Sequence, residues 1–171
     1  MLFRSLQLFT LTTNGENTTN TAEAGSFGNG PDVEYGGNGS IIMTFDTVVR
    51  NLQFSLYDID LSQRATVTAR DAAGNPVNIT MAALAGGIIT VTGSGSASAA
   101  AQANAGAAAD NDSRGTVNVT INGVALGVKS VTMRLTGTSG NFWLSDLAAC
   151  VFGSFPLNRS EEHTSELQSQ N

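Results

Sequence analysis

The amino-acid sequence predicts an all-β fold: an antiparallel, jelly-roll-like β-sandwich of about nine strands, with a β-barrel as the alternative. Three observations lead to this prediction. Apolar and polar residues alternate with a period of two in several short runs, which is typical of half-buried strands. Turns rich in glycine and asparagine separate these runs, and no long amphipathic helix lies between them.

The clearest alternation lies in two runs of the first half of the chain. In the first, Ile41, Met43 and Phe45 occupy every second position, and the run 52–57 repeats the pattern with Leu52, Phe54 and Leu56. Side chains two residues apart on a strand share one face, so each run predicts a strand with one face in the core. The other predicted strands are residues 6–12, 66–70, 78–81, 88–92, 117–121, 129–136 and 142–152.

Two turn signals connect predicted strands. The segment Asp71–Pro76 reads DAAGNP. Glycine and asparagine tolerate positive φ there and proline has a fixed φ, so the segment predicts a hairpin turn. Asn122-Gly123, directly after a predicted strand, predicts a second turn.

Two segments do not resemble strands. Residues 14–38 are rich in Thr, Asn and Gly, and we expect a long surface loop with Val33–Tyr35 touching the sheet edge. Residues 93–115 contain Ser-Gly repeats followed by an alanine-rich stretch. Alanine favours helix, but Gly106 interrupts the stretch and no wide apolar stripe is present. We therefore expect a mobile loop or a marginal surface helix near Ala97–Ala105.

Both chain ends resemble translated sequencing adapters. Residues 159–169 read RSEEHTSELQS, and Leu2–Ser5 match one reading frame of a partner adapter. Segments of this origin are not part of the natural protein. We expect Met1–Ser5 and Arg159–Asn171 to be adapter scars, the second one disordered. Residues 6–158 then form a single β-sandwich domain, a fragment of a larger protein.

This division limits the chemistry open to the domain. The only histidine, His163, lies in the predicted scar. Ser/His/Asp hydrolysis, Cys/His nucleophiles and His-ligated zinc all require an imidazole, so we expect no enzyme. The only cysteine, Cys150, cannot form an internal disulfide. It predicts a small buried side chain on a strand, or half of a disulfide whose partner lies outside the fragment.

The charge pattern bears on partners and location. The chain has 8 basic and 14 acidic residues and a net charge of −6, with Lys129 as its only lysine. A mildly acidic body without a basic stripe predicts no nucleic-acid binding. No run of eighteen apolar residues occurs, so we expect no membrane span. Sparse charge together with abundant Gly, Ala, Asn, Ser and Thr is typical of bacterial secreted or cell-surface modules.

A family resemblance agrees with that location. The run 41–45, the motif VRNLQFSLYDIDLS, the segment 65–75 and the closing FWLSDLAAC resemble repeat-type β-sandwich modules of large secreted or adhesin-like bacterial proteins. The resemblance covers residues 39–150. It implies a jelly-roll-like fold at the cell surface or outside the cell, and a glycan or another surface protein as the partner.

Carbohydrate-binding jelly rolls often hold a structural calcium ion, and this comparison suggests four oxygen donors. Calcium takes six to eight oxygen ligands. Asp58 and Asp60 share a predicted strand face, with Ile59 pointing away. Aspartates at a strand end also commonly bond their own backbone in turns. The calcium candidates are Glu34, Asp58, Asp60 and Asp146.

Sugar recognition in such modules uses exposed aromatic side chains. Trp143, Tyr57 and Tyr35 are the candidates for a glycan site. Strand register decides whether Trp143 is available, because Phe142, Leu144 and Asp146 lie on one face and Trp143 lies on the other. A tryptophan on a central strand commonly packs in the core.

Together these observations predict a non-catalytic, extracellular structural, adhesion or interaction module of a larger secreted protein. The alternative is a carbohydrate-binding module with a structural calcium ion. A glycoside hydrolase would need two acidic groups facing each other across a cleft, and no feature of the sequence indicates a cleft.

Overall fold

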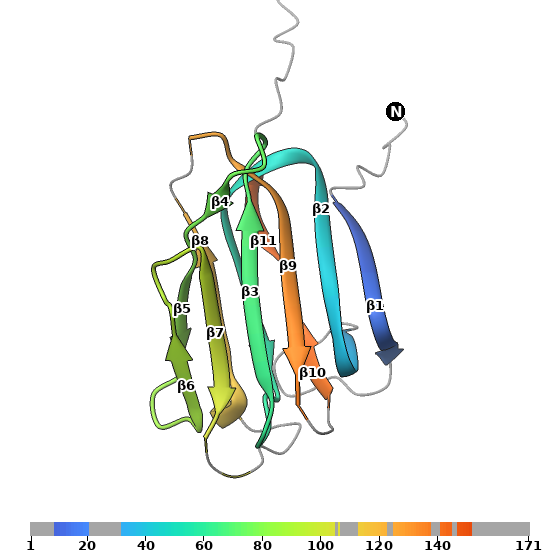
Figure 1. Ribbon diagram of the computed structural model, residues 1–171, viewed down its shortest axis with the longest axis vertical. Coiled ribbons are helices and arrows are strands. Elements are labelled where there is room, and N and C mark those ends of the chain that lie inside the picture. The colour runs from blue at the N-terminus through green and yellow to red at the C-terminus, as the bar shows by residue number, and fades with distance from the viewer. Residues whose placement is uncertain are drawn as a thin grey trace, which may run out of the picture.

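The computed structural model describes residues 9–20, 32–104, 106, 113–122, 125–137, 141–144 and 147–151. The prediction of an all-β antiparallel fold is confirmed (Figure 1). Both predicted adapter scars lie outside the described residues. The strands are β1 (Phe9–Asn20), β2 (Asp32–Tyr57), β3 (Arg64–Arg70), β4 (Pro76–Val77), β5 (Thr80–Ala83), β6 (Ile89–Thr92), β7 (Ser98–Ala103), β8 (Val117–Ile121), β9 (Val128–Thr136), β10 (Asn141–Leu144) and β11 (Ala148–Val151).

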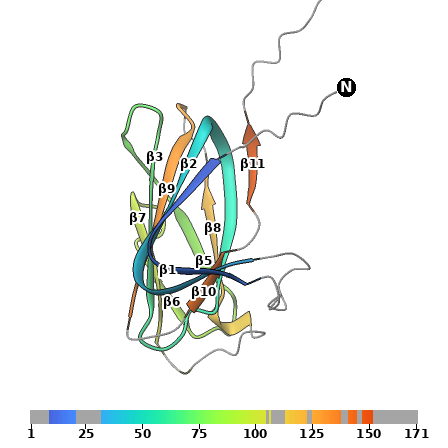
Figure 2. The ribbon, with the colours of Figure 1, turned by 90° about the vertical axis from the view of Figure 1, so that its right-hand side faces the viewer.

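Strand β2 belongs to both layers of the fold. Its first half pairs with β1 on one edge and β9 on the other, and its second half pairs with β8 and β11. The β2–β9 register breaks between Thr44 and Val49, and Asn51 has φ 51°. Asparagine tolerates this left-handed conformation better than most residues. The 26-residue strand therefore bends over the top of the molecule and continues down the other side (Figure 2).

The two layers enclose one core. The larger layer has the strand order β1-β2-β9-β3-β7-β6, and the smaller layer is built from β11, the second half of β2, β8 and β5. The edge of the smaller layer at β5 and the edge of the larger layer at β6 are bridged by hydrogen bonds. The Ile79 N–H donates to Ser96 O at 2.8 Å and the Met81 N–H donates to Ser94 Oγ at 2.9 Å. The sheet is thereby nearly closed into a barrel-like shape.

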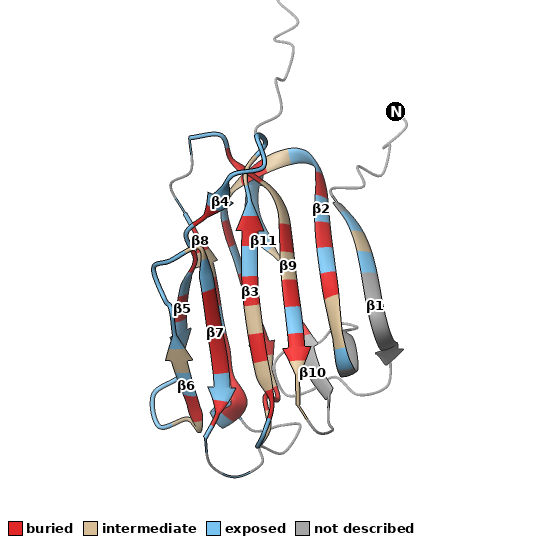
Figure 3. Cartoon of the chain, in the orientation of Figure 1, coloured by how far each residue is buried: buried red, intermediate tan, exposed pale blue. Residues whose placement is uncertain are grey.

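The core follows the predicted alternation. Ile41, Met43 and Phe45 from the first half of β2 are at most 2% exposed, and Leu52 and Leu56 from its second half are fully buried. Red bands alternate with tan or blue bands along β3, β9 and β2 in Figure 3, as expected for period-two burial. The inward faces of both layers thus meet in a continuous apolar interior.

The alanine-rich segment differs from the prediction of a mobile loop or marginal helix. Residues 98–103 form β7, which pairs with β3 and β6. Ala99, Ala101 and Ala103 are at most 3% exposed. The helix propensity of alanine is a weak preference, and a buried site between two strands outweighs it. The outer part of the stretch, residues 107–112, lies outside the described residues.

The predicted surface loop at residues 14–38 was wrong at both of its ends, and residues 21–31 lie outside the described residues. Residues 14–20 continue β1 and residues 32–38 begin β2, with an irregularity in their pairing between Asn14 and Glu16. Polar, threonine-rich segments can form antiparallel strands, because such a sheet can have one face on the core and the other in solvent. The predicted final strand 142–152 is instead two strands, β10 and β11. Strands β4 and β7 were not predicted and two predicted strands are joined in β2, so the described part of the chain has eleven strands rather than nine.

The described part of the chain contains one helix, the three-residue 3₁₀ helix η1 (Ser113–Gly115). In that part no helix has the length and apolar character needed to cross a membrane.

The predicted turn at residues 71–76 is confirmed and centres on Asp71. Its carboxylate accepts hydrogen bonds from the backbone N–H groups of Ala73 and Asn75, at 2.9 and 2.8 Å, and from Asn75 Nδ2 at 3.1 Å. The Asn75 side chain foremost, and then backbone N–H groups of the turn, hold the pKa of Asp71 below its ordinary value of 3.8.

This turn predicts a pH-dependent effect. Because the folded-state pKa is lowered, the stabilisation by Asp71 is present above its ordinary pKa and is lost as the pH falls through the folded-state value. We expect Asp71→Ala to lower the Tm at pH 7 and the difference from wild type to shrink as the pH falls below the ordinary pKa of 3.8. Thermal denaturation across this pH range checks the prediction, with Asp46→Ala as a control for the charge change. A Tm difference that is constant with pH would contradict it.

Candidate functional site

The outer face of the larger layer is rich in hydroxyl groups. Its side chains alternate with the core residues of β1, β2, β9, β3, β7 and β6, and all except Ala100, which is 3% exposed, are exposed or half-buried. Nine threonines and three serines make up most of this surface, which we call the threonine face. Its described members are Thr10, Thr12, Ser40, Ile42, Thr44, Arg64, Thr66, Thr68, Arg70, Thr90, Thr92, Ser98, Gln102, Ser130, Thr132, Arg134 and Thr136.

Strand register arranges these residues in rows across the sheet. One row runs from Ser40 through Arg134 to Thr66, and the next runs from Thr136 through Arg64 to Gln102. The listed members of the threonine face thus include three arginines, and the exposed acidic residue Asp46 follows Thr44 on β2 at the upper end. Since the whole chain has a net charge of −6, this surface is a positive area on an acidic protein.

Two arginines occupy the lower half of the threonine face. The guanidinium of Arg64 donates from Nη1 to Gln102 Oε1 at 3.1 Å and from Nη2 to Thr92 Oγ1 at 3.5 Å. Arg134 is exposed and borders an open hollow of about 380 Å³ lined by residues 38–40 and 134–136. At the rim of this hollow Asn38 Oδ1 accepts the Gly137 N–H at 3.0 Å. The Asn38 side chain is thereby oriented, with its own N–H groups still able to donate.

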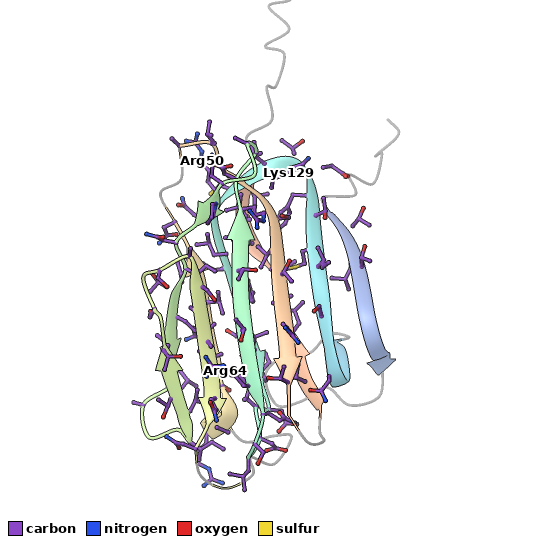
Figure 4. All side chains as sticks on the ribbon, in the orientation of Figure 1. Arg50, Arg64 and Lys129 are labelled. Carbon is purple, nitrogen blue, oxygen red and sulfur yellow. The ribbon has the colours of Figure 1, made fainter. Side chains whose placement is uncertain are left out.

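Two further basic residues serve the upper end of the fold. Figure 4 shows Arg50 and Lys129 there, apart from Arg64 below. Arg50 Nη2 donates to Ala125 O, and Lys129 Nζ donates to Asp46 O at 3.0 Å. These bonds tie β2 to β9 and to the connection that precedes it, so we assign both side chains a structural role.

The smaller layer has a second polar surface. An open hollow of about 400 Å³ lies over β2 and β8, and its polar lining comes from Gln53, Ser55, Asn118 and Thr120. Ser55 Oγ donates to Asn118 Oδ1 at 2.7 Å, which orients that amide. Half-buried Tyr57 follows two residues after Ser55 on the same strand. We call this surface the amide hollow.

The predicted glycan residues meet at the lower end of the fold. Strand β10 pairs with both ends of β2, which places Trp143 in register with Glu34 and with Tyr57 and places Phe142 in register with Tyr35. The side chains of Glu34, Tyr35 and Trp143 lie outside the described parts of the chain. The backbone thus brings together the three predicted glycan residues, which come from distant parts of the sequence.

The predicted calcium residues are arranged differently from expectation. Strand β2 ends at Tyr57, and Asp58 has φ 59°, so Asp58 and Asp60 do not share a strand face. Asp58 is 7% exposed, Ile59 is fully buried in the core and Asp60 is half-buried. The Asp60 N–H donates to Gln63 Oε1 at 2.9 Å, which makes this segment a tight connection to β3.

The described residues bring no three potential metal ligands (His, Cys, Asp or Glu) together. Asp146 lies outside them. Cys150 is exposed on β11, so the prediction of a buried cysteine was wrong. Strand β11 lies at the open edge of the smaller layer, where alternate side chains face outward.

Comparison with protein-family models and with curated proteins gave no match to this chain. Its function is therefore argued from its surfaces. Sequence reasoning did not identify the threonine face, although the signal was present: threonines recur at alternate positions in 10–12, 66–68 and 90–92. Only the register between these runs shows that they form one surface.

Proposed function

We propose that this domain is a non-catalytic interaction module of a larger extracellular protein and that it adheres through its threonine face. The observation that carries this proposal is the extent of that face, which spans six strands of one layer. Hydroxyl groups donate and accept hydrogen bonds. A broad open surface of such groups suits adhesion to a hydroxyl-rich or polar partner better than enclosure of a small substrate.

Composition supports the non-catalytic and extracellular parts of the proposal. Residues 6–158 contain no histidine and a single cysteine. Most chemistry at neutral pH that depends on an imidazole or a paired thiol is thus outside the reach of this domain. Sparse charge and a high content of Gly, Ala, Ser, Thr and Asn are typical of bacterial surface modules.

A second candidate function is sugar binding at the smaller layer. Amide groups and hydroxyls gather in the amide hollow, and an amide fixed by a hydrogen bond can present its remaining N–H groups to a sugar. The backbones of Tyr35, Tyr57 and Trp143 converge at the lower end of the fold. This arrangement favours a carbohydrate-binding module as the alternative, with or without calcium.

A matched pair of substitutions separates the two functions. Thr132 lies at the centre of the threonine face and Thr120 lies in the amide hollow, and both are half-buried threonines on strands. We expect Thr132→Glu to weaken binding to cell surfaces and arrayed glycans at least 10-fold. The introduced carboxylate would lose its hydration when a partner covers this face. Thr120→Glu should leave that binding within about 2-fold, because surface changes away from a contact have small effects.

The measurement uses the whole chain on a glycan array and on bacterial cells, with and without a chelator. If Thr120→Glu alone abolishes binding, the amide hollow is the site and the adhesive role of the threonine face is wrong. Loss of binding with the chelator supports the calcium form of that alternative. Absence of binding under every condition overturns adhesion by either surface.

A further inference from the structure

We propose that the lower half of the threonine face binds a carboxylated polysaccharide, with Arg64 and Arg134 contacting carboxylate groups on successive parts of the polymer. This inference rests on the adhesive function proposed above and names the chemical class of the partner. It follows from the position, orientation and charge of the two arginines and from the polar hollow beside Arg134.

The register places the two arginines at neighbouring positions. Arg134 pairs with Thr66 and Arg64 pairs with Thr136, so the arginines are diagonal neighbours on adjacent strands. Diagonal pairs of this kind lie about 7–8 Å apart. Their long side chains can therefore take one carboxylate each from a single extended chain lying across the strands.

Arg64 is oriented for such a contact. Its bonds to Gln102 and Thr92 use one N–H from each terminal nitrogen. A guanidinium has five N–H donors in a planar fork, so others remain for a ligand. Orienting the guanidinium beforehand lowers the entropy that is lost on binding. The planar fork matches a carboxylate in two-point contact.

The hollow next to Arg134 supplies contacts for the sugar ring. Asn38, Ser40 and Thr136 line it together with Arg134. Its volume of about 380 Å³ is at the low end of the range of small-ligand pockets. Amide and hydroxyl groups of this kind can bond sugar hydroxyls, while the arginine neutralises the acidic group. Both functional groups of a uronic acid thus have counterparts within one hollow.

Charge complementarity favours a polyanion over a neutral glycan. Among the described residues, no hydrogen bond or ion pair joins a carboxylate to Arg64 or Arg134. Two cations that bond no carboxylate within the described part of a protein of net charge −6 form a local anion-attracting area, and this attraction weakens with added salt.

The same surface is poorly suited to the other polyanions. Single-stranded nucleic acid is commonly held by aromatic stacking platforms, and the described members of the threonine face include no aromatic residue. Membrane surfaces are bound by clusters of 4–8 basic residues or by apolar side chains. The threonine face carries three arginines, and its one large apolar residue, Ile42, is 36% exposed. A polymer with many hydroxyls and regular carboxylates is therefore the best match.

The test measures affinity of the whole chain for polygalacturonate and for its fully methyl-esterified form. We expect polygalacturonate to bind at least 10-fold more tightly than the ester. Arg64→Gln and Arg134→Gln should each weaken the binding by about 10–100-fold, the effect of losing a hydrogen bond to a charged group. Arg70→Gln is the matched control, because Arg70 lies on the same strand and face but at the upper end. Arg70→Gln should change the affinity by less than about 3-fold, because at that distance salt screens the effect of the lost charge.

The outcomes separate this inference from the function on which it rests. Equal effects of all three substitutions would show diffuse charge attraction and would overturn the site. Equal binding of the ester, or tighter binding of duplex DNA or of vesicles containing anionic lipid, would overturn the carboxylated-polysaccharide assignment. If polygalacturonate does not bind but the Thr132-dependent adhesion persists, this inference fails while the proposed function stands. If neither is observed, both fail.

Discussion

Replacing Ala101 with aspartate is expected to destabilise the domain by about 4 kcal/mol or more, because it places a carboxylate without a cationic partner in the apolar interior. Ala101 is fully buried, between Ala65 of β3 and Val91 of β6. A loss of this size is a large fraction of the 5–15 kcal/mol that stabilises an ordinary domain. Denaturant unfolding, followed by circular dichroism, measures it.

The matched control lies on the same strand. Ser98 is exposed on β7, three residues before Ala101 and on the opposite face. Ser98→Asp introduces the same charge, and we expect it to change stability by less than about 0.5 kcal/mol. Equal tolerance of both substitutions would mean that the alanine-rich segment is a surface loop, and the assignment of β7 would be wrong.

This segment shows where sequence reasoning reached its limit. Ala99, Ala101 and Ala103 of β7 face the core, but alanine occupies both faces of the strand and Ala100 is buried as well. A pattern of polarity was therefore absent from the sequence, and local propensity favoured helix. Pairing with β3 and β6 decides the conformation, and that information lies in residues up to 38 positions away, as for Arg64 and Gln102.

Elements with a clear polar–apolar alternation were predictable. The runs at 41–45, 52–57 and 117–121 are all strands, because each presents large apolar side chains to one side and polar ones to the other. The joining of the first two of these runs into a single bent β2 was not predictable. The bend depends on a register break between Thr44 and Val49 and on the left-handed conformation of Asn51. From the sequence alone, the segment 46–51 could equally have been a turn between two separate strands.

The candidate sites divide in the same way. Tyr57 and Trp143 were selected from the sequence for their side-chain chemistry, and the topology does place their backbones side by side. The arginine pair was not selected, since Arg64 and Arg134 are 70 positions apart and each looks like an ordinary surface residue. The net charge of the whole chain did not indicate this pair, because a net charge does not show where on the surface the basic residues lie.

Truncating Ile41 to alanine is expected to cost about 2–5 kcal/mol, because the side chain is fully buried and its removal leaves a cavity that the surrounding strands fill only in part. Ile41 pairs with Met133 of β9, which in turn pairs with Val67 of β3. Both of these residues are also at most 1% exposed. The three lie in one row across the middle of the larger layer, so the loss removes packing at the centre of the core.

Ile42 provides a control of the same residue type, one position along and on the other face. It is 36% exposed on the threonine face, and Ile42→Ala should cost less than about 1 kcal/mol, mainly through the lower strand propensity of alanine. The ratio of the two losses in denaturant unfolding tests the register of β2, since a shift by one residue would exchange the two faces. A larger loss for Ile42→Ala than for Ile41→Ala would put the threonine face inside the core and would remove the surface on which both functional proposals depend.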